Sequence, residues 1–249
     1  MEIKLSVIIA TYNSGKTLNK ALNSVKRMHF NQWECIVIDG LSCDNTIEIV
    51  RKYQIEDSRF KYISEPDEGI YDALNKGLRV ARGEWFYVLG SDDELLPDGI
   101  WKMISNSKGY DCVYGDVYLC DNKGKSVLFT SKPVKVLPTA ICCSHQAIIM
   151  KREVVLALGG FDINFRISAD YDLLLRAYLK GYRFYQTHEK IAYFANGEGA
   201  SSHINTYIIK EQYRLYKKNK ANKFPVMVVI WNFIKRLLRN IYDTKKKVE

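Results

Sequence analysis

The chain has 249 residues, of which 47% are hydrophobic and 26% are charged, a composition typical of a folded globular protein. Its 15 glycines and 5 prolines exclude collagen-like and proline-rich chains, and no repeat indicates a solenoid. The apolar run at residues 5–10 lacks the basic start and the cleavage site of a secretion signal, so we expect a cytoplasmic protein.

The formal net charge of +9 lies entirely at the C-terminal end. Residues 1–209 carry 25 basic and 25 acidic side chains, whereas residues 210–249 carry 12 basic and 3 acidic ones. Such an asymmetry predicts a neutral body with an extension that meets an anionic surface, either a nucleic acid or a membrane.

The first part of the chain alternates short apolar runs with amphipathic segments. This alternation predicts a parallel sheet with helices on both faces. The strongest helix signal lies after Glu68, and we expect Gly83 to end that helix. Its apolar stripe is Ile70, Ala73, Leu74, Gly77, Leu78 and Ala81. The expected strands are 5–10, 33–39, 60–64 and 85–90.

The second part of the chain is less regular. A hairpin is expected at 111–119 and 125–130, because Asp121-Asn122-Lys123-Gly124 is a typical turn sequence. A strand at 144–150 and a helix at 170–180 follow.

Polar residues follow the expected strands where each strand ends. They are Thr11 to Asn13, Asp39 with Asp44, and Asp92 with Asp93. Because ligands of parallel α/β sheets bind at the carboxyl ends of the strands, we expect these clusters to form one binding rim.

Asp92 and Asp93 come directly after a strongly apolar strand. Two adjacent carboxylates suit Mg²⁺ or Mn²⁺ shared with a phosphate, although an acidic turn or a helix cap has the same sequence. Asp39 could bind a dinucleotide ribose, but the first strand is followed by A-T-Y-N-S-G and not by G-x-G-x-x-G. A nicotinamide dehydrogenase is therefore disfavoured, and the lack of G-x-x-x-x-G-K-[ST] excludes a P-loop NTPase.

Asp170 stands at the start of the expected helix 170–180. Its carboxylate could cap that helix or act as a general base at the rim. Asp172, two residues later, is expected to point into solvent.

Laid in order, these segments resemble family 2 glycosyltransferases with the GT-A fold. The matching strings are S-V-I-I-A-T-Y-N-S at 6–14, V-I-D-G-L-S-C-D-N-T at 37–46, S-E-P-D-E-G-I-Y-D-A-L-N-K-G at 64–77, G-S-D-D at 90–93, C-S-H-Q-A-I-I-M at 143–150 and A-D-Y-D-L-L-L-R at 169–176. The resemblance is strongest to the branch that builds bacterial O-antigen, capsule and related surface polysaccharides.

The resemblance implies a metal-dependent, inverting transfer of a sugar from a nucleotide-sugar, most often a UDP-sugar, to a hydroxyl of a glycan or lipid-linked acceptor. Asp170 corresponds to the catalytic base and Asp93 to the ligand of Mn²⁺ or Mg²⁺. Ala169 stands where many members carry an acidic residue, which puts the handling of the acceptor in question. Residues implied to bind the nucleotide-sugar are Thr11, Tyr12, Asn13, Asp39, Asp67, Lys76 and Asp92; His145 and His203 are candidate contacts of the acceptor or the diphosphate.

We therefore expect an α/β protein with a GT-A, Rossmann-like, mixed and mostly parallel sheet and helices on both faces. The transferase domain would cover 1–204, with a nucleotide-sugar half at about 1–110 and an acceptor half at about 111–204. A basic amphipathic helical extension would cover 205–249.

In that extension, the pattern at residues 226–243 predicts an amphipathic helix. Asn232, Lys235 and Arg236 lie on its polar stripe, and Phe233 and Ile234 lie on the opposite, apolar face. Its apolar part is too short to span a bilayer, so it indicates contact with an anionic membrane, at the inner face of the cell membrane, or packing on the body or a second subunit. Two other functions remain open: a silent nucleotide-sugar-binding scaffold at the membrane and a nucleic-acid binder. The latter is disfavoured because the extension lacks a known nucleic-acid-binding motif.

Overall fold

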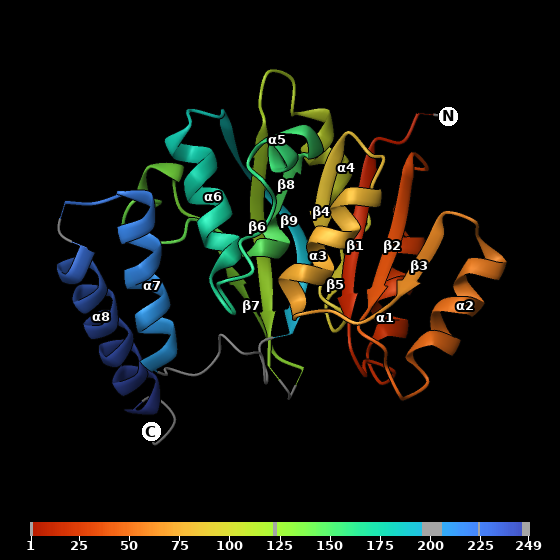
Figure 1. The fold of residues 1–249 in the computed structure, drawn as a ribbon, viewed down its shortest axis with the longest axis horizontal. Helices are drawn as coiled ribbons and strands as arrows, with labels where there is room; N and C mark the ends of the chain where they lie inside the picture. Colours follow the sequence, from red (N-terminus) through yellow and green to blue (C-terminus); the bar gives the residue numbers. More distant parts are fainter. Residues whose placement is uncertain (1, 122–123, 196–205, 224, 246–249) are drawn as a thin grey trace.

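A nine-stranded mixed sheet forms the centre of the computed structural model, which describes residues 2–121, 124–195, 206–223 and 225–245 (Figure 1). The strand order is β3-β2-β1-β4-β8-β6-β9-β5, with β7 paired to β6. The strands are β1 Leu5–Thr11, β2 Trp33–Asp39, β3 Phe60–Ser64, β4 Trp85–Val88, β5 Glu94–Leu95, β6 Cys112–Cys120, β7 Ser126–Phe129, β8 Ile148–Lys151 and β9 Phe184–Ala195.

The parallel part of the sheet is the part that the apolar runs predict. Strand β1 pairs in parallel with β2 and β4, and β2 pairs in parallel with β3. Beyond β4, strand β8 runs antiparallel to both β4 and β6, whereas β6 and β9 are parallel to each other. The expected mixed sheet is confirmed, and each of its antiparallel pairs includes a strand that begins after residue 111.

Helices cover both faces of the sheet because successive side chains of a buried strand point to opposite sides. Val7 and Ile9 pack with α1, α2 and α4, whereas Ile8 packs with α3, α5 and α6. The helices are α1 Leu18–Lys26, α2 Thr46–Glu56, α3 Ile70–Val80, α4 Gly99–Ser105, α5 Arg152–Ala157, α6 Ala169–Leu179, α7 Thr206–Asn219 and α8 Pro225–Lys245, with short 3₁₀ turns η1 Val134–Val136 and η2 His145–Ala147.

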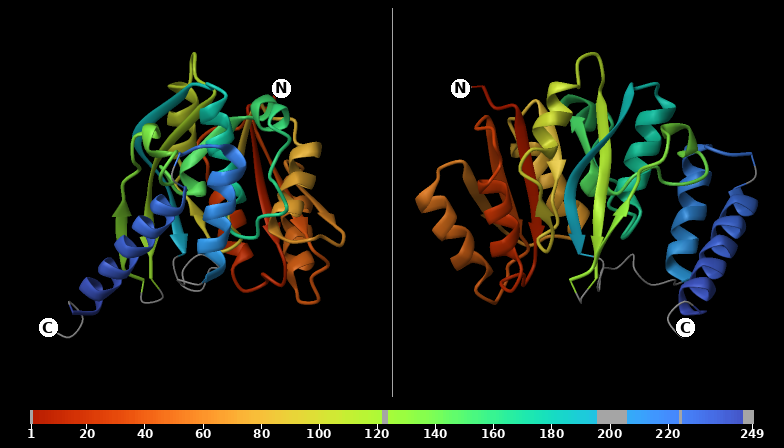
Figure 2. Two further views of the ribbon diagram at one scale, coloured as in Figure 1. Left: turned by 60° about the vertical axis from the view of Figure 1, so that its left-hand side comes forward. Right: turned by 180° about the vertical axis from the view of Figure 1, so that it is seen from behind.

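Helices α7 and α8 lie side by side at the end of the sheet that is farthest from α2 (Figures 1 and 2). Leu215 and Tyr216 of α7 and Val229 of α8 are buried, and the Asn232 amide donates to the Thr139 carbonyl over 2.8 Å. No helix in the described ranges is long and apolar enough to cross a membrane.

Two local expectations are wrong. Helix α3 ends at Val80, and the chain is already extended at Ala81. Gly83 is required for another reason: a Cβ there would lie 2.4 Å from the Ser6 backbone nitrogen, so only glycine lets the chain pass this close to β1. Residues 145–147 of the expected strand form η2, from which the Gln146 amide donates to Asp93 at the rim.

The expected helix stripe after Glu68 is buried, except that Ile70 is 52% exposed at the start of α3. Strand β9 was not expected at all. Its apolar run at 191–195 follows five polar residues at 186–190, and its pairing with β6 carries register shifts between Tyr114 and Val117. The expected boundary at 204/205 falls on residues outside the described ranges, so the domain division stays a prediction.

Candidate active site

The polar clusters predicted to share a rim lie along one edge of the sheet. Thr11 is the register partner of Asp39, and Asp39 is the register partner of Ser64. The hydroxyl oxygens of Ser14 and Ser91 are 3.1 Å apart and join the end of β1 to the segment after β4. The chain therefore brings the expected residues of its first half together.

The end of β1 and the segment after it combine a hydroxyl without a described hydrogen-bond partner, on Thr11, with a solvent-exposed aromatic ring, on Tyr12. The buried Thr11 hydroxyl has no hydrogen-bond partner within the described part of the chain, and Tyr12 is 63% exposed. Asn13 is left-handed, a conformation that asparagine tolerates; its N–H donates to Ser42 and its side-chain oxygen accepts from the Cys43 N–H. These contacts fix the segment and leave Tyr12 free to meet a ligand.

Asp39 is fully buried at the end of β2. Its carboxylate accepts from the hydroxyl and N–H of Ser42 and, over 2.7 Å, from the hydroxyl of Ser64. These three hydrogen bonds leave Oδ1 of Asp39 able to accept one more, since a carboxylate has about four acceptor sites.

Asp67 and Lys76 form the neighbouring wall. The Asp67 carboxylate lies directly against Gly40, where a Cβ would clash with it, and it accepts from the Gly69 N–H over 2.8 Å. The Lys76 ammonium pairs with Glu65 at 3.1 Å and Asp72 at 3.4 Å and donates to the Pro66 carbonyl. Lys76 therefore holds the loop after β3 on α3.

Asp92 and Asp93 differ sharply in their surroundings. Asp92 is exposed, whereas Asp93 is 1% exposed and uses both carboxylate oxygens. Gln146 donates its amide to Asp93 over 2.6 Å, and the Ala195 N–H donates over 2.9 Å. Burial raises the pKa of Asp93, and the Asp92 charge raises it further against these hydrogen bonds.

Turn η2 connects Asp93 to the second half of the site. Gln146 binds Asp93, and its own carbonyl accepts from the Tyr87 hydroxyl over 2.9 Å. His145 lies on the other side, with Nδ1 3.8 Å from Asp170 Oδ2. Sequence reasoning missed Gln146 because the apolar residues after it suggested a strand.

Asp170 occupies the first turn of α6, with 21% of its side chain exposed. Its Oδ1 accepts from the Tyr171 N–H over 2.7 Å. Burial raises the pKa of Asp170, and the neighbouring His145 opposes that rise. His203, the other histidine suggested by the sequence, lies outside the described residues.

The backbone before Asp170 is held by a residue that the sequence did not indicate. Glu211 of α7 is 1% exposed, and its carboxylate accepts from the N–H groups of Arg166, Ile167 and Ser168 at 2.5, 3.1 and 3.0 Å. From α3, the Tyr71 hydroxyl donates to the Ile167 carbonyl over 2.7 Å. The segment that carries Asp170 is thus fastened by two helices.

Asp172 is not solvated, which corrects the expectation from sequence. It is fully buried and forms hydrogen bonds and ion pairs with Arg176, Lys218 and Asn219. Helix α7 supplies two of these partners, and this long-range packing is what buries the carboxylate.

The described residues contain no cluster of three His, Cys, Asp or Glu side chains that could hold a metal ion. Asp92 and Asp93 nevertheless supply the hard oxygen donors that Mg²⁺ and Mn²⁺ prefer. The raised pKa of Asp93 marks a poorly compensated buried charge that a cation would neutralise. The pair fits part of a coordination shell, with other oxygens needed to complete it.

A family model described as Glycosyl transferase family 2 matches residues 6–158. The chain belongs to this family of glycosyltransferases. A relative from Mycobacterium bovis named "PGL/p-HBAD biosynthesis glycosyltransferase" is 29% identical over 178 residues, which are 70% of this chain and 69% of that protein. The "GalNAc(5)-diNAcBac-PP-undecaprenol beta-1,3-glucosyltransferase" of Campylobacter jejuni is 34% identical over 132 residues, 52% of this chain and 43% of that protein.

Solved transferase structures share the fold of this glycosyltransferase. S. aureus TarS 1-349 in complex with UDP-GlcNAc has a TM-score of 0.69 at 20% identity, over 87% of this chain and 65% of that one. The mannosyltransferase PcManGT from Pyrobaculum calidifontis, in complex with GDP-Man and Mn²⁺, has a TM-score of 0.67 at 18% identity, over 92% of this chain and 68% of that one. The GT-A fold implied by the sequence strings is confirmed.

The Glu211 contacts predict a specific loss of stability. Glu211→Gln places an amide group against backbone N–H donors, so we expect the free energy of unfolding to fall by about 1–3 kcal/mol. Chemical denaturation measures this change, and Glu153→Gln, at an exposed position in the first turn of α5, is the matched control. Equal stability of the two variants would contradict a fastening role for Glu211.

Proposed function

We propose that this glycosyltransferase moves a sugar from a UDP-sugar to a hydroxyl of a glycan or lipid-linked acceptor, with inversion and with a divalent cation. The observation that carries the proposal is the placement of η2 between two carboxylates. Gln146 binds buried Asp93 on the nucleotide side, and His145 faces Asp170 on the other side. A donor phosphate and an acceptor hydroxyl can therefore be held at one short segment.

On the donor side, the rim residues would bind the nucleotide. The unsatisfied Thr11 hydroxyl and the exposed Tyr12 ring offer a hydrogen bond and a stacking surface. Asn13, Asp39, Asp67, Lys76 and Asp92 complete the set that we assign to the nucleotide-sugar. The UDP-GlcNAc complex of TarS supports a uridine nucleotide, although TarS shares only 20% identity with this chain.

Asp93, with Asp92 beside it, would hold Mn²⁺ or Mg²⁺, and the Mn²⁺ complex of PcManGT supports this assignment. A bound divalent cation supplies positive charge against the diphosphate that leaves. Phosphate oxygens of the donor would supply the ligands that the described carboxylates do not.

On the acceptor side, Asp170 would take the proton of the attacking hydroxyl. A carboxylate whose pKa is raised by burial is a stronger base than a solvated one once it is ionised. We assign one base and no carboxylate nucleophile, so the reaction would be a single displacement with inversion. His145, at 3.8 Å from Asp170, would touch the acceptor or the diphosphate.

The donor side is tested by calorimetric titration of UDP, GDP and dTDP with and without Mn²⁺. We expect UDP to bind only with metal, because Asp93 and the diphosphate would share the cation, and we expect Asp93→Ala to abolish that binding. Asp121→Ala, in the turn between β6 and β7, is the control. A screen of UDP-sugars for hydrolysis then identifies the donor.

Absence of metal-dependent binding for all three nucleotides would show that the assignments at Asp39 and Asp93 are wrong. Binding without any turnover of UDP-, GDP- or dTDP-sugars would instead favour the silent nucleotide-sugar-binding scaffold.

The base assignment predicts a pH dependence. Asp170 must be ionised to accept a proton, so its raised pKa moves the acidic limb of the kcat profile toward higher pH. His145→Gln removes a charge that opposes the rise in the pKa of Asp170, so we expect the acidic limb to move to still higher pH. The measurement is kcat for donor hydrolysis against pH.

Asp170→Asn should lower kcat by about 10²- to 10⁴-fold. His29→Gln, at a histidine that is 64% exposed and paired with Asp98, should leave the profile unchanged. If His145→Gln leaves the acidic limb of the kcat profile in place, the charge of His145 has no effect on the ionisation of Asp170.

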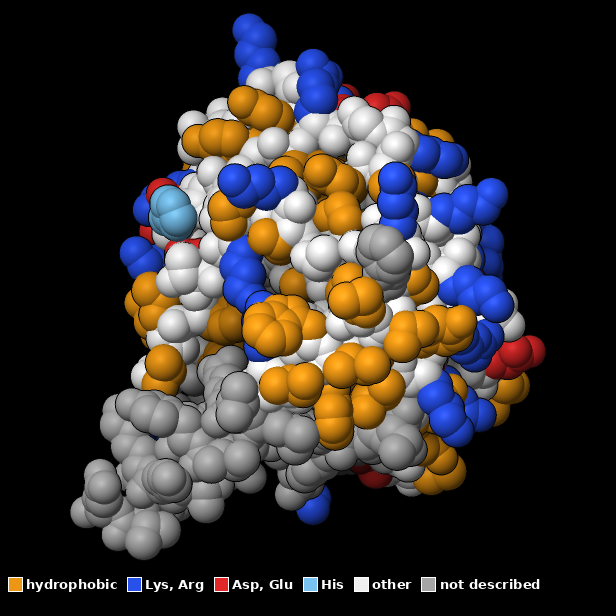
Figure 3. Space-filling model, turned by 90° about the vertical axis from the view of Figure 1, so that its left-hand side faces the viewer, with side chains coloured by type: hydrophobic (Ala, Val, Ile, Leu, Met, Phe, Trp, Pro, Cys, Tyr) orange, Lys and Arg blue, Asp and Glu red, His pale blue; other side chains and the backbone are white. Residues whose placement is uncertain are grey.

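We also propose that α8 lies on an anionic membrane at its inner face. Val226, Met227, Ile230, Trp231 and Ile234 are 40% to 66% exposed on one side of the helix. Figure 3 shows hydrophobic side chains gathered on this face with Lys and Arg around them. Lys217, Lys220, Lys223 and Lys235 are exposed on or next to these helices, which suits anionic headgroups.

Vesicle sedimentation tests this contact with mixed phosphatidylglycerol and phosphatidylcholine. We expect the double variant Ile230→Ser, Trp231→Ser to bind at least about tenfold more weakly, because two exposed apolar side chains are lost. Ile55→Ser, at an 85% exposed position of α2, is the control. Concentration-dependent self-association of wild type without vesicle binding would instead assign this face to a second subunit.

A further inference from the structure

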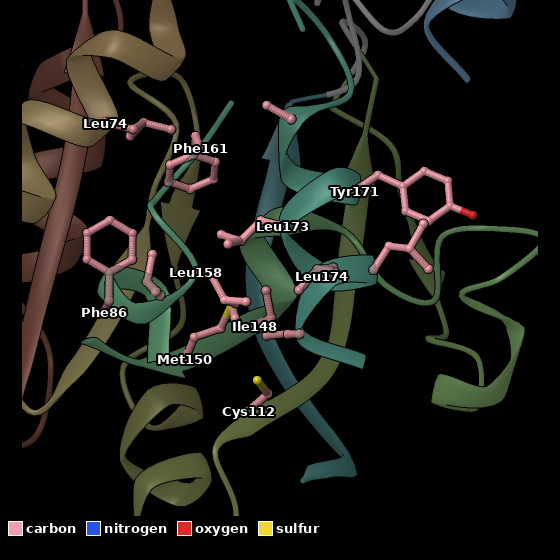
Figure 4. Close-up of a cluster of buried hydrophobic side chains, with 14 of the residues drawn as sticks. Leu74, Phe86, Cys112, Ile148, Met150, Leu158, Phe161, Tyr171, Leu173 and Leu174 are labelled. Atoms are coloured by element: carbon pink, nitrogen blue, oxygen red, sulfur yellow. The ribbon is translucent and has the colours of Figure 1, made fainter. Parts of the chain in front are cut away.

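A small apolar cavity lies beside Asp170, between α3 and α6 and above β4 and β8. It has a volume of about 70 Å³. Leu74, Phe86 and Phe161 form one wall, and Ile148, Leu173 and Leu174 line the opposite part (Figure 4). The aromatic wall is well defined, because the Tyr71 and Phe161 rings stack with centroids 5.6 Å apart.

The mouth of the cavity carries its polar groups. Asp170, His145 and Tyr71 are the lining residues with polar side-chain groups; Asp170 and His145 face each other at 3.8 Å, and the Tyr71 hydroxyl donates to the Ile167 carbonyl. Ile70 lines the same cavity and is 52% exposed, although its position in the helix stripe predicts burial. The cavity is therefore accessible from the surface, on the side where the proposed base lies.

The interior suits an apolar group better than water. A buried water needs two to four polar partners, and apolar cavities stay dry. By the space that a water requires, roughly 10–15 Å³, this volume holds a group of a few heavy atoms and is too small for a lipid chain.

We propose that this cavity is an acceptor subsite that takes a small apolar substituent next to the reacting hydroxyl. The hydroxyl would sit within hydrogen-bond reach of Asp170, and the substituent would enter between Leu74 and Leu174. The chemical class is an acceptor with a methyl, acetyl or short alkyl group near the attacking oxygen, such as a deoxy or acetylated sugar. This inference rests on the proposed function, because it takes Asp170 as the base.

Simple alcohols test the subsite without knowledge of the natural acceptor. The donor found by hydrolysis is incubated with equal concentrations of propan-1-ol or ethane-1,2-diol, which have the same number of heavy atoms. The ratio of alkyl glycoside to hydrolysed sugar is measured for each alcohol, corrected for the two hydroxyls of the diol. We expect propan-1-ol to be favoured by at least about fourfold, the effect of one buried methylene.

Two variants at one position locate the effect. Leu174→Phe narrows the cavity and should bring the ratio between the two alcohols close to one. Leu174→Ala widens it and should shift the preference from propan-1-ol toward hexan-1-ol. Leu179→Phe, on the same helix but 46% exposed, should leave both preferences unchanged.

Each preference is a ratio within one protein, so a general loss of stability does not move it. If Leu174→Phe fails to fold, the shift in Leu174→Ala still decides the question. Hydrolysis of the donor without a preference for propan-1-ol, or with a preference that Leu174→Ala leaves unchanged, overturns the subsite while the transferase function stands. If no nucleotide-sugar is hydrolysed, the proposed function fails and the subsite fails with it.

Discussion

The buried carboxylate of Asp93 is the constraint on which the site depends. A charge at 1% exposure is stable only when its hydrogen bonds are supplied, and here they come from Gln146 and the Ala195 N–H. These two bonds join the turn between β4 and β5 to η2 and to the end of β9. Segments that are distant in sequence are thereby locked at one edge of the sheet, and His145 is turned toward Asp170 as a consequence.

The same principle operates at the second carboxylate cluster. Glu211 satisfies three backbone N–H groups in the loop just before α6, where no sheet or helix of the described chain supplies acceptors for them. Helix α7 is thereby fastened to α6, since Lys218 and Asn219 of α7 also bind the buried Asp172. Because α8 packs on α7, its exposed apolar face and the segment that carries Asp170 belong to one packed unit. A surface that docks on α8 would hold the segment that carries Asp170 at a fixed orientation.

The hydrophobic periodicity of the sequence is sufficient to predict the strands and helices of the first half of the fold and the rim at the ends of its strands. Apolar runs such as Leu5–Ala10 are buried on both faces, and parallel pairing then places Thr11 beside Asp39 whatever the loops do. The second half could not be predicted in the same way. Strand β9 has few buried apolar residues, and Gln146, Glu211 and Asp172 acquire their roles from partners on other elements, which no local pattern records. The predicted burial of Ile70 is wrong for a different reason. Ile70 lies on the expected face of α3, but that face borders a cavity at this position and not a packed side chain.

Four departures from local rules share a location, whereas the unpartnered Trp33 Nε1 and Arg152 Nε and the left-handed Lys220 lie elsewhere in the described chain. Thr11 buries a hydroxyl that lacks a partner in the described chain, Asn13 is left-handed, Asp93 buries a charge and Ile70 exposes an apolar side chain. Each costs free energy in the protein alone, and all four lie at the rim or at the mouth of the adjoining cavity. A bound donor would supply a partner for Thr11, a cation would offset Asp93, and an apolar substituent would cover Ile70. Since one ligand-bound state relieves three of these costs, their clustering is a physical reason to place the chemistry here, independent of any resemblance between sequences.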